Sequence, residues 1–125
     1  MEIRNAHFPG RAPLDAYGNG GFRFAEMSHR GSLLCVPSGI YGWNLKDPSE
    51  FSQGAFQRVL DEQATIEVLL IGTGQDLRPL PAHLKEMFRE ASILADPMST
   101  GAAVRTYNVL LSENRAVAAA LLAVD

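Results

Sequence analysis

Polar residues that could hold an anion follow two apolar runs of the sequence. The segment Gly72-Thr73-Gly74 comes after the run 66–71, and Asp96 comes after the short run 93–95. In α/β sheets, ligands collect beyond the carboxyl ends of the strands, so both points are expected to border one crevice. Backbone amides in such a loop could face a phosphate or a carboxylate.

Arg105 and Asn108 supply the remaining polar groups of this candidate site. They lie three residues apart on one face of a predicted helix that Ser99 or Thr100 can cap. Arg105 could pair with Asp96 and fix the loop, or it could bind a ligand anion together with the helix N-terminus. As a third possibility, this polar face binds a partner protein. The candidate ligand or partner surface comprises Gly72, Thr73, Gly74, Asp96, Ser99, Arg105 and Asn108.

Simpler structural roles compete with each of these assignments. The two glycines could only permit a tight turn, and Leu77 replaces the third glycine of a dinucleotide fingerprint. An aspartate before proline, as in Asp96-Pro97, is typical of the start of a turn. For both segments, the sequence favours the turn interpretation.

The sequence contains no complete catalytic or metal-binding motif. His7, His29 and His83 lack the spacing of metal ligands, and Cys35 is the only cysteine. The strong signatures of hydrolases, nucleotide-triphosphate enzymes and zinc peptidases do not occur. We therefore expect no metal, no cofactor and no catalytic residue, and a non-enzymatic protein is favoured although an activity is not excluded.

Length and charge narrow the class of protein further. The chain has 125 residues, 46% of them hydrophobic, which suits one domain with a buried core. Its net charge of -3 and scattered basic residues make nucleic acid an unexpected partner. No apolar run is long enough for a membrane-spanning helix or a signal peptide, so a cytoplasmic location is expected. Cys35, beside Leu34 and Val36, is predicted to be a buried thiol.

The first half of the chain is predicted to begin irregularly and then to form β-structure. Residues 1–20, rich in glycine and proline, are expected to be an irregular lead-in with one short strand near Ile3, followed by a single α/β domain over 21–125. Alternating apolar residues predict a β-hairpin over 22–36 whose turn is His29-Arg30-Gly31. A short extended piece follows over 40–45, with Trp43 as an apolar anchor.

The second half predicts alternating helices and strands. Helical periodicity predicts helices over 47–63, after Pro81 to about Ala91, and over 99–112. Strands are expected over 66–71 and 93–95. The alanine-rich end, 116–124, is ambiguous between helix and strand, and we interpret it as a strand. Strands that alternate with helices in this way indicate an α/β fold with a parallel or mixed sheet.

Several short motifs together resemble a small family of domains of unknown function with archaeal, bacterial and mitochondrial members. That family includes the mitochondrial NADH dehydrogenase (complex I) assembly factor 3. The resemblance covers roughly residues 20–122. Its motifs are Gly39-Ile40-Tyr41-Gly42-Trp43, Leu69 to Gly74, Asp96-Pro97-Met98, Ala102 to Asn108, and Glu113 to Leu121.

The resemblance implies a three-layer α/β fold: a central mixed sheet of about five strands, flanking helices and a small β-hairpin layer. It also implies a scaffold or adaptor that binds a protein partner during complex I assembly, with no established catalytic residue. Thr100 and Arg115 match the family at positions with structural roles. Two alternatives remain: the chain forms a homo-oligomer through the polar helix face, or it is a binding protein or enzyme for a small anion.

Overall fold

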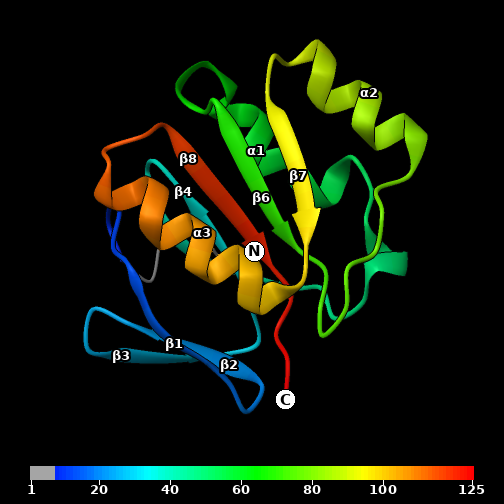
Figure 1. Ribbon diagram of the computed structural model, residues 1–125. Helices are drawn as coiled ribbons and strands as arrows, with labels where there is room; N and C mark the ends of the chain where they lie inside the picture. Colours follow the sequence, from blue (N-terminus) through cyan, green and yellow to red (C-terminus); the bar gives the residue numbers. More distant parts are fainter. Residues whose placement is uncertain (1–7) are drawn as a thin grey trace, which may run out of the picture.

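The fold contains two β-sheets and three α-helices, seen here in a computed structural model that describes residues 8–125 (Figure 1). The larger sheet has five strands in the order β5-β4-β8-β6-β7, and the smaller has three in the order β1-β2-β3. Strands β6, β7 and β8 are parallel, whereas β4 runs antiparallel to β5 and β8. The strands are β1 (Leu14–Gly18), β2 (Gly21–Phe24), β3 (Met27–Arg30), β4 (Ser32–Val36), β5 (Gly39–Trp43), β6 (Val68–Gly72), β7 (Leu94–Met98) and β8 (Val117–Leu121); the helices are α1 (Gln57–Asp61), α2 (Ala82–Glu90) and α3 (Thr100–Ser112).

The alanine-rich strand β8 is the middle strand of the larger sheet, as the strand interpretation of the sequence required. All five of its residues are buried, although alanine favours helices in isolation. Ala118 and Ala120 belong to the core on one face of the sheet and Ala119 to the core on the other. Packing on both faces therefore overrides local propensity.

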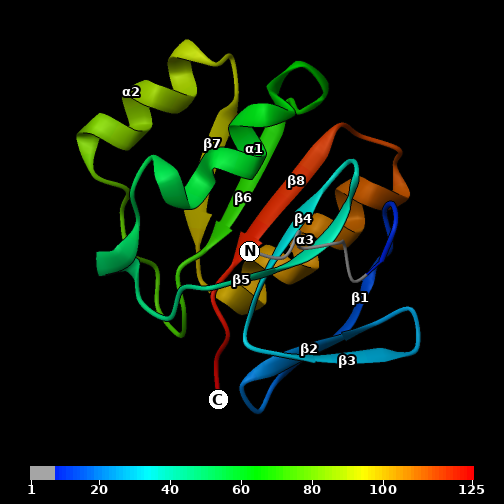
Figure 2. The same cartoon turned by 180° about the vertical axis from the view of Figure 1, so that it is seen from behind.

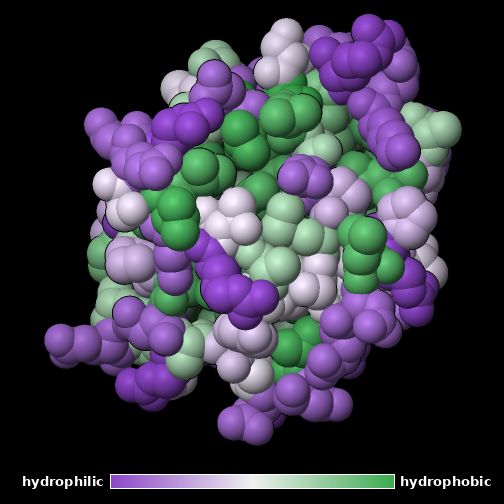
Figure 3. Space-filling view, viewed as in Figure 1, coloured by the Kyte–Doolittle hydropathy of each residue, from purple (hydrophilic) through white to green (hydrophobic). Residues whose placement is uncertain are grey.

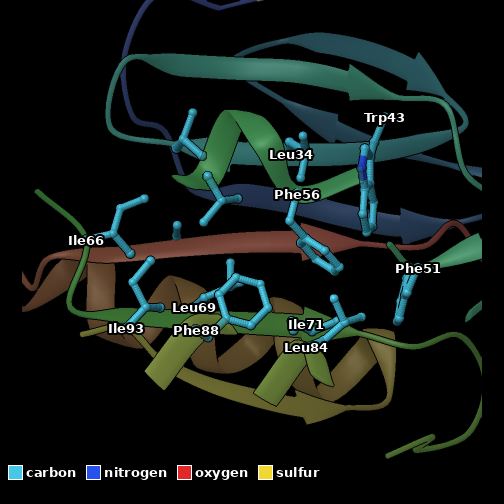
Figure 4. Packing of buried hydrophobic residues seen from close by; sticks show 14 of the residues in the cluster. Leu34, Trp43, Phe51, Phe56, Ile66, Leu69, Ile71, Leu84, Phe88 and Ile93 are labelled. Atoms are coloured by element: carbon cyan, nitrogen blue, oxygen red, sulfur yellow. The ribbon is translucent and has the colours of Figure 1, made fainter. Parts of the chain in front are cut away.

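Helices α1 and α2 cover one face of the five-stranded sheet over an aromatic core (Figure 4). Phe56 is central to this core, with its ring centroid 5.4 Å from that of Trp43 and 5.1 Å from that of Phe88. The Trp43 indole N–H donates to the carbonyl of Ala55 at 2.8 Å. Trp43 thus anchors the end of β5, as its size predicted.

Helix α3 and the small sheet cover the opposite face (Figure 2). Phe22 and Phe24 of β2 are buried there with Tyr107 of α3 and Leu33 of β4. The molecule therefore has the predicted three-layer architecture around a mixed five-stranded sheet.

The small β layer differs from the predicted hairpin in its strands and in its turn. His29 and Arg30 lie inside β3, not in a turn, and the chain reverses instead at Ala25 and Glu26, whose φ angles are 49° and 64°. Two positive φ angles suit the twist of a two-residue hairpin. Gly31, with φ 101°, then joins β3 to β4 in the other sheet.

The expected irregular lead-in contains regular structure. Residues 14–18 form β1, which pairs with β2 to make the small sheet three-stranded. This strand was missed because its burial pattern shows only Leu14 fully buried, so no apolar alternation marks it. The strand expected near Ile3 lies outside the described residues.

Two further expectations need correction. The helix predicted over 47–63 is broken into short 3-10 turns and α1, because Phe51 has extended backbone angles, φ -65° and ψ 128°, and turns into the aromatic core. Asp96-Pro97 is not a turn but part of β7, which runs to Met98. Proline fits there because β7 is an edge strand, where a missing N–H costs no ladder hydrogen bond.

Candidate functional site

Thr100 joins three segments at the carboxyl ends of the parallel strands. Its buried hydroxyl donates to the carbonyl of Leu122 at 2.7 Å and accepts from the N–H of Gly74 at 3.1 Å. Its own N–H donates to the carbonyl of Gly74 at 2.8 Å. The loop after β6, the start of α3 and the chain after β8 are thereby held together.

Each residue of the segment Gly72-Thr73-Gly74 has a structural role. A Cβ atom at Gly72 would lie 3.0 Å from the Cα of Thr100 and from the side chain of Leu121, so a side chain there would push these neighbours apart. The Thr73 hydroxyl donates to the carbonyl of Asp76 at 2.6 Å and accepts from the N–H of Arg78 at 2.9 Å. Gly74 has φ 111°, a value that favours glycine.

The first turn of α3 uses most of its free amides within the chain. The Ser99 side chain accepts from the N–H of Ala102 at 3.3 Å, which confirms Ser99 as the helix cap. The N–H of Ala103 donates to the carbonyl of Ser99, and that of Thr100 to Gly74. Few donors are left at this helix end to bind an anion.

Asn108 fastens the small sheet to α3. Its amide oxygen accepts from the N–H of Leu14 at 2.8 Å, and its amide nitrogen donates to the carbonyl of Leu14 at 2.8 Å. Gly101, on the same helix face, approaches Tyr17 so closely that a Cβ would lie 2.4 Å from the phenol oxygen. The helix face predicted to be polar and open is therefore largely covered by β1.

Asp96 and Arg105 do not meet. Both side chains are exposed, and within residues 8–125 neither takes part in a salt bridge. Asp96 lies on the edge strand β7. Arg105 lies on the side of α3 that carries Gly101 and Asn108, both of which contact β1. The structure thus brings Gly72, Thr73, Gly74 and Ser99 together and leaves Asp96, Arg105 and Asn108 apart from them.

A small hollow of about 260 Å³ lies beside the Thr73 loop. It is lined by two cationic side chains, Lys46 and Arg78, and by the carboxylates of Asp47, Asp76 and Asp125. The pKa of Asp47 is lowered, chiefly because the Ser49 N–H donates to its carboxylate at 2.9 Å and to a lesser extent because of the Arg78 charge. Carboxylates outnumber cations here, so this hollow does not favour an anion.

The strongly shifted titratable groups are buried in the core, away from any opening. Burial raises the pKa of the Cys35 thiol to about 12, and burial also raises that of the Tyr107 hydroxyl, to which the thiol is hydrogen-bonded. A thiol that stays protonated is a poor nucleophile. Within the described part of the chain, no cluster of three His, Cys, Asp or Glu residues could hold a metal.

The sequence did not reveal two exposed apolar side chains, one on β7 and one on α3. Leu94 of β7 is 67% exposed and Val109 of α3 is 54% exposed. In Figure 3, apolar side chains gather above α3 in the region where Figure 1 draws β8, β6 and the start of β7. Leu94 and Asp96 lie two residues apart on β7, and Val109 lies on α3; we call the exposed surface that these three residues contribute the α3–β7 face. An apolar strand residue looks like a core residue in the sequence, so no signal distinguished Leu94.

The architecture defines a class of Mth938-like α/β domains. A Bordetella pertussis protein described as a Mth938-like domain superposes with a TM-score of 0.80 at 25% identity, over 98% of this chain and 92% of that one. A Bartonella henselae protein, described as an outer membrane protein, is 63% identical with a TM-score of 0.92, over 95% of this chain and 100% of that one.

The chain belongs to the family described as "Protein of unknown function (DUF498/DUF598)", which matches residues 14–122. An uncharacterized protein of Rhodobacter capsulatus is 42% identical over 98% of this chain and 93% of its own length. The mouse NADH dehydrogenase [ubiquinone] 1 alpha subcomplex assembly factor 3 is 24% identical over 98% of this chain. The chain spans 66% of the length of that mouse protein. The resemblance found in the sequence is thus confirmed.

No helix within residues 8–125 has the length and apolar character needed to cross a membrane.

Proposed function

We propose that this chain is a non-enzymatic interaction protein that assists the assembly of respiratory complex I, and that it acts in the cytoplasm. The relationship to complex I assembly factor 3 supports this role. The observation that carries it is the α3–β7 face, where the large apolar side chains of Leu94 and Val109 are exposed to water. Exposed apolar patches commonly mark protein interfaces.

The α3–β7 face has the composition of a binding surface. Leu94 and Val109 supply apolar contact area, and Asp96, which has no salt bridge within residues 8–125, lies two residues from Leu94 on the same strand. Charged residues around an apolar centre are typical of interfaces that form and dissociate. From the predicted surface residues, Asp96 and Arg105 remain available to a partner, while Gly72, Thr73, Gly74, Ser99 and Asn108 support the elements that present them.

A different protein is the proposed occupant of this face, in keeping with the assembly role of the relatives. Affinity capture from cells that assemble complex I tests the proposal, with complex I subunits quantified by mass spectrometry. Leu94→Asp should lower their recovery, because a carboxylate would have to be desolvated in the interface. A second copy of this chain as the only captured species, or a stable dimer in light scattering, would contradict it.

Binding of a small anion at the strand ends is the weaker alternative. The hollow beside Thr73 is where such a ligand would sit, but its carboxylates outnumber its cations and the amides of α3 are mostly used. A thermal-shift screen with anionic metabolites distinguishes the two. A stabiliser whose effect is lost in Arg78→Gln and kept in Arg105→Gln would favour the ligand role.

A further inference from the structure

A basic groove lies along β5, at the edge of the five-stranded sheet opposite the α3–β7 face. Its volume is about 660 Å³, within the range of ligand sites. Four basic residues line it together with two aromatic ones: His29, Arg30, Lys46, Arg58, Tyr41 and Trp43.

The groove concentrates positive charge in a chain that is acidic overall. Among the described residues that line it there is no aspartate and no glutamate, whereas the whole chain has a net charge of -3. Glu62, one helical turn after Arg58, is held by the N–H of Ser38 at 3.0 Å and does not line the groove. Outside this lining, the Glu50 carboxylate accepts from the N–H of Lys46 at 2.6 Å and Asp47 is the next residue, so carboxylates border the Lys46 end. A concave lining of one sign focuses the electric field and attracts the opposite charge.

The walls of the groove are held in place by contacts within the chain. The Arg58 guanidinium carbon lies 3.7 Å from the centroid of the Tyr41 ring, a cation-π contact that orients the charge. The Ser32 hydroxyl donates to the carbonyl of Leu45 at 2.7 Å and accepts from the N–H of Ala123 at 2.9 Å. Pre-ordered walls lower the entropy lost on binding.

The charges are spread along the groove. Arg58 lies over Tyr41 in the middle of β5, and Lys46 follows the end of the strand. At about 3.3 Å per residue, the five steps from Tyr41 to Lys46 span up to about 16 Å. A single phosphate would reach only one end, whereas an extended peptide with several carboxylates would reach both.

We propose that the β5 groove binds an acidic, extended segment of a partner protein. The net charge of -3 disfavours a nucleic acid, whose long anionic backbone would meet acidic surface outside the groove. The hollow shape disfavours a flat membrane surface. This site lies at the other edge of the sheet from the α3–β7 face, so it can exist whether or not that face binds complex I subunits.

Fluorescence anisotropy with the full chain tests this inference. The probe is a labelled peptide of alternating glutamate and glycine at low ionic strength, compared with its glutamine counterpart and with an oligothymidylate of equal charge. The double variant Arg30→Gln and Lys46→Gln removes two exposed charges from the groove. The matched control, Lys85→Gln and Arg89→Gln on α2, changes the net charge equally outside the groove.

The glutamate peptide should bind, and its affinity should fall as salt is added. Its affinity should be about tenfold lower for the groove variant and unchanged for the α2 control. The single variant Arg58→Gln should also weaken it. Three results would overturn the proposal: equal losses in the groove and control variants, equal binding of the glutamine peptide, or tighter binding of the oligothymidylate.

Discussion

Thr100 connects the loop after β6, helix α3 and the end of β8 through one buried hydroxyl. Thr100→Val keeps the shape of the side chain but leaves the N–H of Gly74 and the carbonyl of Leu122 without this partner. We expect a loss of about 2 kcal/mol in the free energy of unfolding, measured by urea denaturation. Thr106→Val is the matched control: Thr106 is half-buried in the same helix and its hydroxyl has no hydrogen bond within the described residues, so it should cost far less. Equal costs would contradict the role of Thr100.

Cys35 makes stability depend on pH in the alkaline range. In the folded protein the pKa of its thiol is about 12, above the ordinary value of 9.0. The stability that the buried, protonated thiol contributes is therefore complete below about pH 9 and is lost as the pH rises toward 12. Between pH 9 and 10 the contribution of the thiol to the free energy of unfolding should fall by on the order of 1 kcal/mol per unit. Chemical denaturation across this window should show a smaller slope for Cys35→Ala. An unchanged slope would exclude the thiol as the cause.

For single residues, the sequence predicted local roles better than it predicted which distant residues lie close together. The Ser99 cap and the buried Cys35 follow from short-range pattern. The distance between Asp96 and Arg105 depends on which way β7 and α3 turn their side chains, and sequence spacing does not determine this. The two glycines have different structural roles: Gly72 ends β6 and packs closely against Thr100, whereas Gly74 has the positive φ of a turn residue.

At the element scale, Asn108 is the polar link between α3 and β1. Asn108→Ala removes both hydrogen bonds to Leu14 and should destabilise the fold by about 2 kcal/mol. Hydrogen exchange at the amides of β1 should accelerate, because the strand loses its attachment to the helix. Arg105→Ala, an exposed change three residues away, should stay within about 0.5 kcal/mol. Unchanged exchange in β1 would show that burial of Leu14 alone holds the strand.

Elements with strong periodicity were predictable, and those shaped by tertiary contacts were not. Helices α2 and α3 and strand β6 follow from apolar spacing. The helix expected over 47–63 breaks because Phe51 joins Trp43 in the core, with ring centroids 5.8 Å apart. Strand β1 has little apolar alternation, and its place depends on the side chain of Asn108 in a distant helix.

At the scale of the whole molecule, the three-layer fold follows from the order of strands and helices together with the family resemblance. The exposed surfaces of the fold do not follow from this order. Leu94 is apolar and lies in a strand, so only the position of β7 at the sheet edge, beyond the cover of α3, leaves it in water. The basic groove likewise combines residues from β3, β5 and α1 that are scattered in the sequence.

The recovery of complex I subunits on captured Leu94→Asp protein shows whether the α3–β7 face binds them. Leu77→Asp is the matched control, because Leu77 is 59% exposed in the loop after β6, outside the α3–β7 face. We expect wild-type and Leu77→Asp protein to recover the same subunits, and Leu94→Asp to recover about tenfold less, because a carboxylate is then placed in an apolar contact. Absence of complex I subunits from the wild-type capture, or equal recovery by both variants, would contradict it.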